Sequence, residues 1–136
     1  MNNGVPEDAV QLVSGLLGHI KQIVGDGASY AMLHYGAVEE GKRIGAGYDN
    51  KGLHAMLARI DAVLAQQSDV LKDDGDTVTV RVHSSPLLKT GHRSVQGIVV
   101  GLLEGALSAS RHGRFKGAVV QPTTAGELTA ELKREA

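Results

Sequence analysis

The segment Ser94–Arg111, SVQGIVVGLLEGALSASR, decides how the rest of the chain is interpreted. Its glycines Gly97, Gly101 and Gly105 recur every fourth residue, so on a helix they form one bare stripe. Each glycine costs a helix about 1 kcal/mol relative to alanine. Three together indicate that another helix, a strand or a bound molecule packs closely against this helix. Beside the stripe runs a broad apolar face made of Ile98, Val99, Leu102, Leu103, Ala106 and Leu107.

The segments on both sides of this helix have the two-residue period of β-strands. Thr77 to His83 alternates, with valines on one face and polar residues on the other. It follows a short strand at Val70 and Leu71 and the turn Asp73-Asp74-Gly75-Asp76, which predicts a hairpin. A second hairpin is predicted from Phe115 to Gln121 and from Leu128 to Lys133, with its turn at PTTAGE.

Upstream of the first hairpin, three segments have helical spacing. One begins at Pro6 and ends near Gly25, one begins near residues 27–29 and is interrupted by glycines, and one is capped by Asp49 or Asn50. The order ααα-ββ-α-ββ predicts a single α+β domain over residues 1–136. We expect two layers, an antiparallel four-stranded sheet covered on one face by about four helices.

Composition excludes several classes of function. The net charge is −1 and aromatic residues are 3%, which argues against a nucleic-acid partner. Cysteine is absent, which excludes disulfides and thiolate metal sites. No apolar run approaches the roughly 20 residues of a membrane span, and the first residues, MNNGVPEDA, lack the charge and the apolar region that we would expect of a signal peptide. We therefore expect a cytoplasmic protein that does not insert into membranes.

Three stretches resemble the 4-vinyl reductase domains, which share a fold with certain subunits of vesicle-tethering complexes. They are YAMLHYGAVEEGKRIGAGY (30–48), TVTVRVHSS (77–85) followed by VQGIVVGLLEGAL (95–107), and RFKGAVVQPTTAGELTAEL (114–132). The resemblance covers nearly the whole chain. It implies a domain, often dimeric, that binds a small or hydrophobic molecule. Its role would be in sensing or regulation, or as an accessory to tetrapyrrole or hydrocarbon metabolism.

The chain departs from that family in one respect. Many 4-vinyl reductase domains carry zinc-binding cysteines around the closing hairpin, and this chain has none. The six histidines match no zinc-binding spacing either, so we expect no metal. A glycine-rich dinucleotide turn after a strand is also missing. We therefore expect no cofactor and do not carry over the reductase chemistry that the family name suggests.

The candidate ligand-binding residues lie on the predicted helices and at one strand end. Glu104 lies among apolar residues, and a buried carboxylate needs a partner or a proton. Arg81 or Arg43 could neutralise it, in which case it is a rim carboxylate or a structural ion pair. A general acid is the alternative. The full set is Tyr30, Tyr35, His83, Leu102 and Glu104.

The loop SSPLLKTGHRS (84–94) offers a candidate anion site, because it brings Lys89, His92 and Arg93 to the start of the central helix. It lacks the residue order of a phosphate-binding loop. The alternative is an ordinary capped loop.

Two questions stay open from the sequence. The glycine stripe packs either on the chain's own sheet or at a helix–helix seam between two copies of the chain. For function, we predict a homodimer that binds a small, largely apolar ligand between helices and sheet. The alternatives are a small enzyme that uses Glu104 and His83 as acid and base, and a structural assembly subunit without ligand.

Overall fold

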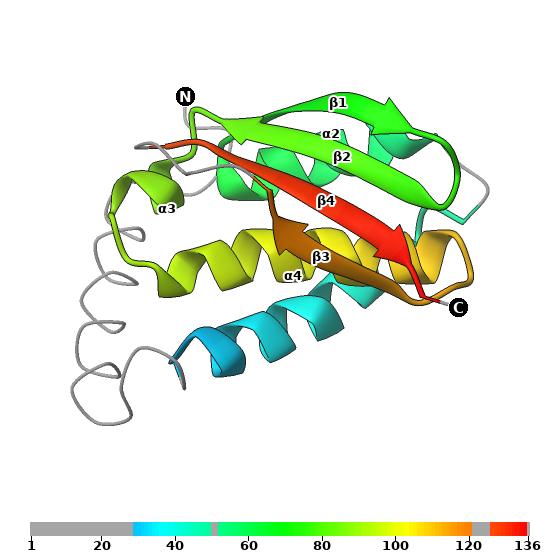
Figure 1. Ribbon diagram of the computed structural model, residues 1–136, viewed down its shortest axis with the longest axis horizontal. Coiled ribbons are helices and arrows are strands. Elements are labelled where there is room, and N and C mark those ends of the chain that lie inside the picture. Colours follow the sequence, from blue (N-terminus) through cyan, green and yellow to red (C-terminus); the bar gives the residue numbers. More distant parts are fainter. Residues whose placement is uncertain (1–28, 50–51, 121–125, 136) are drawn as a thin grey trace.

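The computed structural model describes residues 29–49, 52–120 and 126–135. Along the chain these residues form helix 29–46, α2 (Leu53–Leu64), β1 (Gln67–Asp73), β2 (Thr77–His83), α3 (Pro86–Lys89), α4 (Ser94–Ser110), β3 (Phe115–Val119) and β4 (Leu128–Arg134). The helix predicted to begin at Pro6 lies outside the described residues, as does most of the PTTAGE turn. Figure 1 shows α2, α4 and helix 29–46 on one side of the sheet. The predicted two-layer α+β architecture is therefore confirmed.

The sheet has four strands in the order β1-β2-β4-β3, and each neighbouring pair is antiparallel. The two predicted hairpins, β1–β2 and β3–β4, are present, and pairing of β2 with β4 joins them into one sheet. Strands β1 and β3 form its two edges. Because β3 follows α4 directly, this edge strand runs back along the helix that carries the glycine stripe (Figure 1).

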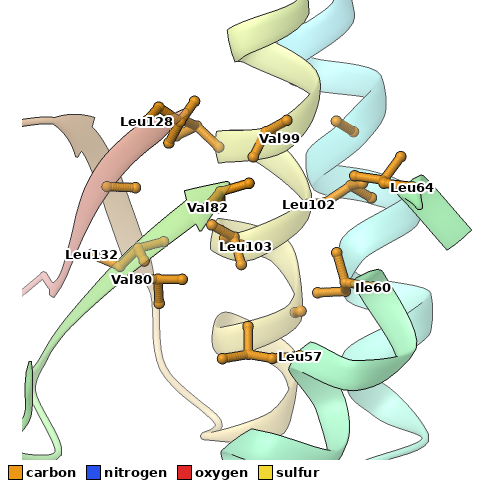
Figure 2. Close-up of a cluster of buried hydrophobic side chains, with 14 of the residues drawn as sticks. Leu57, Ile60, Leu64, Val80, Val82, Val99, Leu102, Leu103, Leu128 and Leu132 are labelled. Carbon is orange, nitrogen blue, oxygen red and sulfur yellow. The ribbon is translucent and has the colours of Figure 1, made fainter. Parts of the chain in front are cut away.

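The core lies between the sheet and the helices. Val78, Val80 and Val82 of β2 are 0% exposed, as the alternating pattern predicts. They stand in register with the apolar residues Leu132, Ala130 and Leu128 of β4. Leu57, Ile60 and Leu64 of α2 belong to the same apolar cluster as these strand residues and as Val99, Leu102 and Leu103 of α4. Figure 2 shows Leu64 beside Leu102, and Val99 beside Leu128 of β4.

The glycine stripe packs against helix 29–46 of the same chain. The two helices run in the same direction, with Gly97 beside Tyr30 and Gly105 beside Val38 and Lys42. A Cβ placed on Gly101 would lie 2.7 Å from the carbonyl oxygen of His34, too close for any side chain.

Helix 29–46 contributes glycines of its own to this contact. Gly41 lies against the backbone of Leu102, and Gly45 lies against that of Ala106. We call the five residues Gly41, Gly45, Gly97, Gly101 and Gly105 the glycine seam. The stripe is therefore filled by another helix, one of the three partners that the glycine spacing allowed. The two narrower interpretations, packing on the chain's own sheet and a seam between two copies of the chain, are wrong.

Three predicted local features also need correction. The segment expected as a loop contains α3, where the Ser85 hydroxyl accepts a hydrogen bond from the Leu88 amide and Pro86 occupies the first turn. Asp49 does not cap α2, whose N-cap is Gly52 without a side-chain hydrogen bond. Strand β1 is longer than the two residues predicted, because pairing with β2 recruits polar residues that no hydrophobic pattern marks.

We expect Gly105→Ala to destabilise the fold. Alanine gains up to about 1 kcal/mol of helix propensity. Its Cβ would overlap the carbonyl oxygen of Val38, however, and overpacking of this kind costs about 1–3 kcal/mol. Gly36→Ala is the matched control, because Gly36 lies in helix 29–46 with no atom within 4 Å of its Cβ position.

Urea unfolding should therefore show Gly105→Ala less stable than the parent protein and Gly36→Ala more stable, by up to about 1 kcal/mol. A Gly105→Ala protein at least as stable as the parent would contradict close packing at the seam.

Candidate ligand-binding groove

Glu104 is buried between three elements. It belongs to α4, and only 6% of the residue is exposed. Its Oε2 lies 2.9 Å from Nε2 of His34, on helix 29–46. Its Oε1 accepts a hydrogen bond from the backbone N–H of Gly117, on β3. The carboxylate therefore joins the helix layer to the edge of the sheet.

The contact between α4 and β3 is possible because one turn of the helix is about as long as two residues of the strand. Ser108, one turn after Glu104, accepts a hydrogen bond of 3.0 Å from the N–H of Phe115. Four helical residues span about 6 Å and two strand residues about 6.6 Å, so two side chains of α4 can reach two alternate amides of β3. These amides lie on the edge of the sheet and would otherwise remain unpaired.

Gly117 allows the strand to come this close. A Cβ there would lie 2.8 Å from Cγ1 of Val100 and 3.3 Å from Cγ of Glu104. A larger residue would move β3 away from α4 and lengthen the hydrogen bond to the carboxylate.

Tyr30 supports His34 from its other side. The two rings are stacked, with centroids 5.9 Å apart and planes within 9° of each other. Burial raises the pKa of the Tyr30 phenol, and the negative charge of Glu104 raises it further, while Arg93 acts in the opposite direction. The phenol is therefore neutral at physiological pH.

A groove of about 640 Å³ opens beside Glu104, between helix 29–46, α4 and β3. This volume is in the range of small-molecule sites. The carboxylate and His34 form part of its wall, together with apolar and aromatic side chains. The residues that line it are His34, Tyr35, Val38, Glu39, Lys42, Glu104, Ser108, Ala109, Gly113, Arg114, Phe115, Lys116 and Glu135.

Charged residues surround the mouth of the groove. Lys42 pairs with Glu39 at 3.5 Å, and Arg114 pairs with Glu135 at 3.5 Å. Lys116 has no ion pair within the described part of the chain. Exposed pairs of this kind contribute little to stability, so these side chains are available to a ligand.

The structure brings together only some of the predicted ligand-binding residues. Tyr35 and Glu104 both line the groove, and Tyr30 reaches it only through its stack on His34. Leu102 belongs to the buried core. His83 pairs with Asp69 at 3.0 Å and does not meet Glu104, so the predicted acid–base pair is not formed.

The expected partners of Glu104 were wrong. Arg81 pairs with Glu127, because both lie on the exposed face of the sheet. Arg43 pairs with Glu40, three residues before it on the exposed face of helix 29–46. The true partner, His34, was missed. The sequence gives one indication of His34: it lies one helical turn before the apolar residue Val38, on the helix that glycines interrupt. This indication is useful only once helix 29–46 is known to pack against α4.

The predicted anion site gains no support. In the first turn of α4, the amides of Val95 and Gln96 bond the carbonyls of His92 and Arg93. Lys89 lays its aliphatic stem against Gly126. Anion binding by Lys89, His92 and Arg93 stays a prediction.

A second hollow, of about 620 Å³, lies at the far end of α4. Its charged groups are already paired. Arg111 binds Asp73 through both nitrogens, at 2.9 and 2.7 Å, and Arg134 binds Asp76 at 3.0 Å. The hydrogen bond from Arg111 holds the pKa of Asp73 below its usual value, while partial burial opposes it. We interpret this hollow as an ion-pair cluster that fixes the β1–β2 turn to α4.

Asp73→Asn should lower the free energy of unfolding at neutral pH by up to about 1 kcal/mol, since solvent screens a partly exposed pair. Asp73 has a lower pKa in the folded state, so its stabilisation is present above the unfolded pKa of about 4 and is lost as pH falls through the folded value. The difference between parent and variant should therefore shrink on acidification.

Urea unfolding at a series of pH values measures this difference. Glu40→Gln, which breaks the exposed pair with Arg43, is the control and should change stability by less than about 0.5 kcal/mol. A parent–variant difference that stays constant at acidic pH would contradict the assignment.

Among the described residues, no group of three or more metal-binding side chains is placed to hold an ion, and the expectation of no metal stays a prediction. The described helices include none with the length and apolar character needed to span a bilayer.

The two-layer α+β fold of this chain resembles that of a subunit of a vesicle-tethering complex. A similar solved structure is subunit 3 of the trafficking protein particle complex from Naegleria fowleri, covalently bound to palmitic acid. The match has a TM-score of 0.63 and covers 96% of this chain and 98% of that one, at 13% sequence identity. At this identity the likeness shows the fold alone.

The predicted link to the tethering-complex fold is therefore confirmed. No protein-family model and no curated protein matches this sequence. The narrower resemblance to the 4-vinyl reductase domains accordingly stays a prediction.

Proposed function

We propose that the chain binds a small, largely apolar ligand in the groove between helix 29–46, α4 and β3. The observation that supports this best is the composition of the groove. Val38, Ala109 and Phe115 offer apolar surface, while Glu104 and His34 supply two convergent polar groups. Small-molecule sites combine these features, with apolar contact for affinity and few polar groups for orientation. A sensing, regulatory or accessory role in the cytoplasm fits such a domain.

The tethering-complex subunit with the same fold lends this proposal support, since it carries a fatty acid. That subunit is covalently bound to its palmitic acid. This chain has no cysteine, so no thioester to an acyl group can form here. We therefore propose reversible, non-covalent binding.

We expect Ala109→Trp to abolish ligand binding, because the indole would fill the apolar end of the groove. Ala58→Trp is the matched control, since Ala58 is exposed on α2 and does not line the groove. Native mass spectrometry of the protein purified from its own host should show a co-purifying small molecule with the parent and with Ala58→Trp. It should show none with Ala109→Trp. Equal retention by both variants would place the ligand elsewhere.

An assembly subunit is the second candidate. Its support is the exposure of two large apolar side chains on helix 29–46, Met32 at 59% and Tyr35 at 69%, together with the role of the structural neighbour as a complex subunit. The predicted homodimer would use this face, because the glycine seam is already filled. Sedimentation at micromolar concentration that shows only a 14.2 kDa species would exclude the homodimer.

A further inference from the structure

The wall of the proposed site presents hydrogen-bond acceptors that the protein leaves partly unused. An ionised carboxylate accepts about four hydrogen bonds. Glu104 receives one from the Gly117 amide and one from His34. No other group in the described residues donates to it. At least one side of this buried carboxylate is therefore open to a donor from the groove.

His34 adds a second acceptor. Its Nε2 faces the carboxylate, so a neutral ring must carry its proton on Nε2. The other nitrogen, Nδ1, then has a lone pair and no proton. Within the described residues nothing donates to Nδ1, and the side chain is 30% exposed where it lines the groove. In the neutral ring Nδ1 is thus an acceptor beside the carboxylate, whereas in a protonated ring Nδ1 carries a proton and the acceptor of the wall is Glu104.

We infer that the groove selects an apolar molecule that carries a hydrogen-bond donor, a hydroxyl or amine, at the end that reaches Glu104. This inference rests on the proposed function. A hydrogen-bond donor on the ligand replaces the hydrogen bond from water that the carboxylate of Glu104 loses when the ligand binds. An ether or hydrocarbon at the same place leaves the carboxylate desolvated without a partner. A carboxylate head would also meet the charge of Glu104.

The mouth of the groove provides the competing interpretation. Lys116 has no ion pair in the described residues, and it could hold an anionic head at the mouth with the apolar tail directed inward. That orientation would leave Glu104 against the tail. Ligands that differ only in their polar end can separate the two arrangements.

Decanol and methyl nonyl ether are suitable probes, because they have the same number of non-hydrogen atoms and differ in the hydroxyl proton. Decanoate provides the anionic end on a chain of similar length. We expect decanol to bind the parent protein about tenfold or more tightly than the ether, as a hydrogen bond to a charged group implies. Decanoate should bind more weakly than decanol. Competition against a fluorescent apolar probe measures all three in one assay.

Failure of this inference is distinguishable from failure of the proposed function. If the three compounds bind and Ala109→Trp weakens all of them, but the ether equals decanol or decanoate binds most tightly, donor selection is excluded while groove binding stands. If none binds, or if Ala109→Trp changes nothing, the proposed function falls together with the inference.

Glu104→Gln provides an independent check, because the amide replaces one acceptor oxygen by a donor. The decanol-to-ether ratio should fall towards one in this variant and persist in Glu40→Gln, whose residue lies outside the groove. An unchanged ratio in a folded Glu104→Gln protein would overturn the inference. If the variant does not fold, the comparison of ligands on the parent protein still decides.

Discussion

Direct backbone contact between helix 29–46 and α4 is the constraint on which the rest of this structure depends. Five glycines remove the side chains that would hold the two helices apart. This close contact fixes the relative positions of side chains on the two helices. His34 comes within hydrogen-bonding distance of Glu104, and the space beside the two helices becomes a groove bounded by β3. Each glycine costs helix propensity, so the seam persists only because packing across it offsets that cost.

Glu104 shows how a buried charge is made compatible with this packing. Unpaired burial of a carboxylate is very costly, whereas the hydrogen bonds from His34 and the Gly117 amide reduce that penalty. The same contacts cover the edge of the sheet, which protects β3 from pairing with another chain. One side chain therefore serves both the fold and the wall of the groove, and a ligand would meet a group that is already held rigidly.

The sequence predicted those features that depend on local periodicity. Alternation placed β2 at Thr77–His83, and the 3.6-residue period placed α4 to within one residue of its end. The stripe of glycines correctly indicated close packing, but it could not identify the partner, because helix 29–46 is distant in the chain. The groove was largely missed for the same reason, since His34, Glu104 and Phe115 meet only after three separate elements pack. Arg81, on a neighbouring strand, and Arg43 were expected as partners because of their charge, but Arg81 pairs with Glu127 and Arg43 pairs with Glu40.

Hydrogen exchange of the Gly117 amide tests the central claim most directly. Gly117 lies on an edge strand, where an amide that points away from β4 would exchange rapidly if no side chain covered it. The contact with Glu104 predicts strong protection in the parent protein and its loss in a folded Glu104→Ala variant, while the amide of Ala118, which faces β4, stays protected. A Gly117 amide that exchanges in the parent as fast as an exposed one would contradict the account.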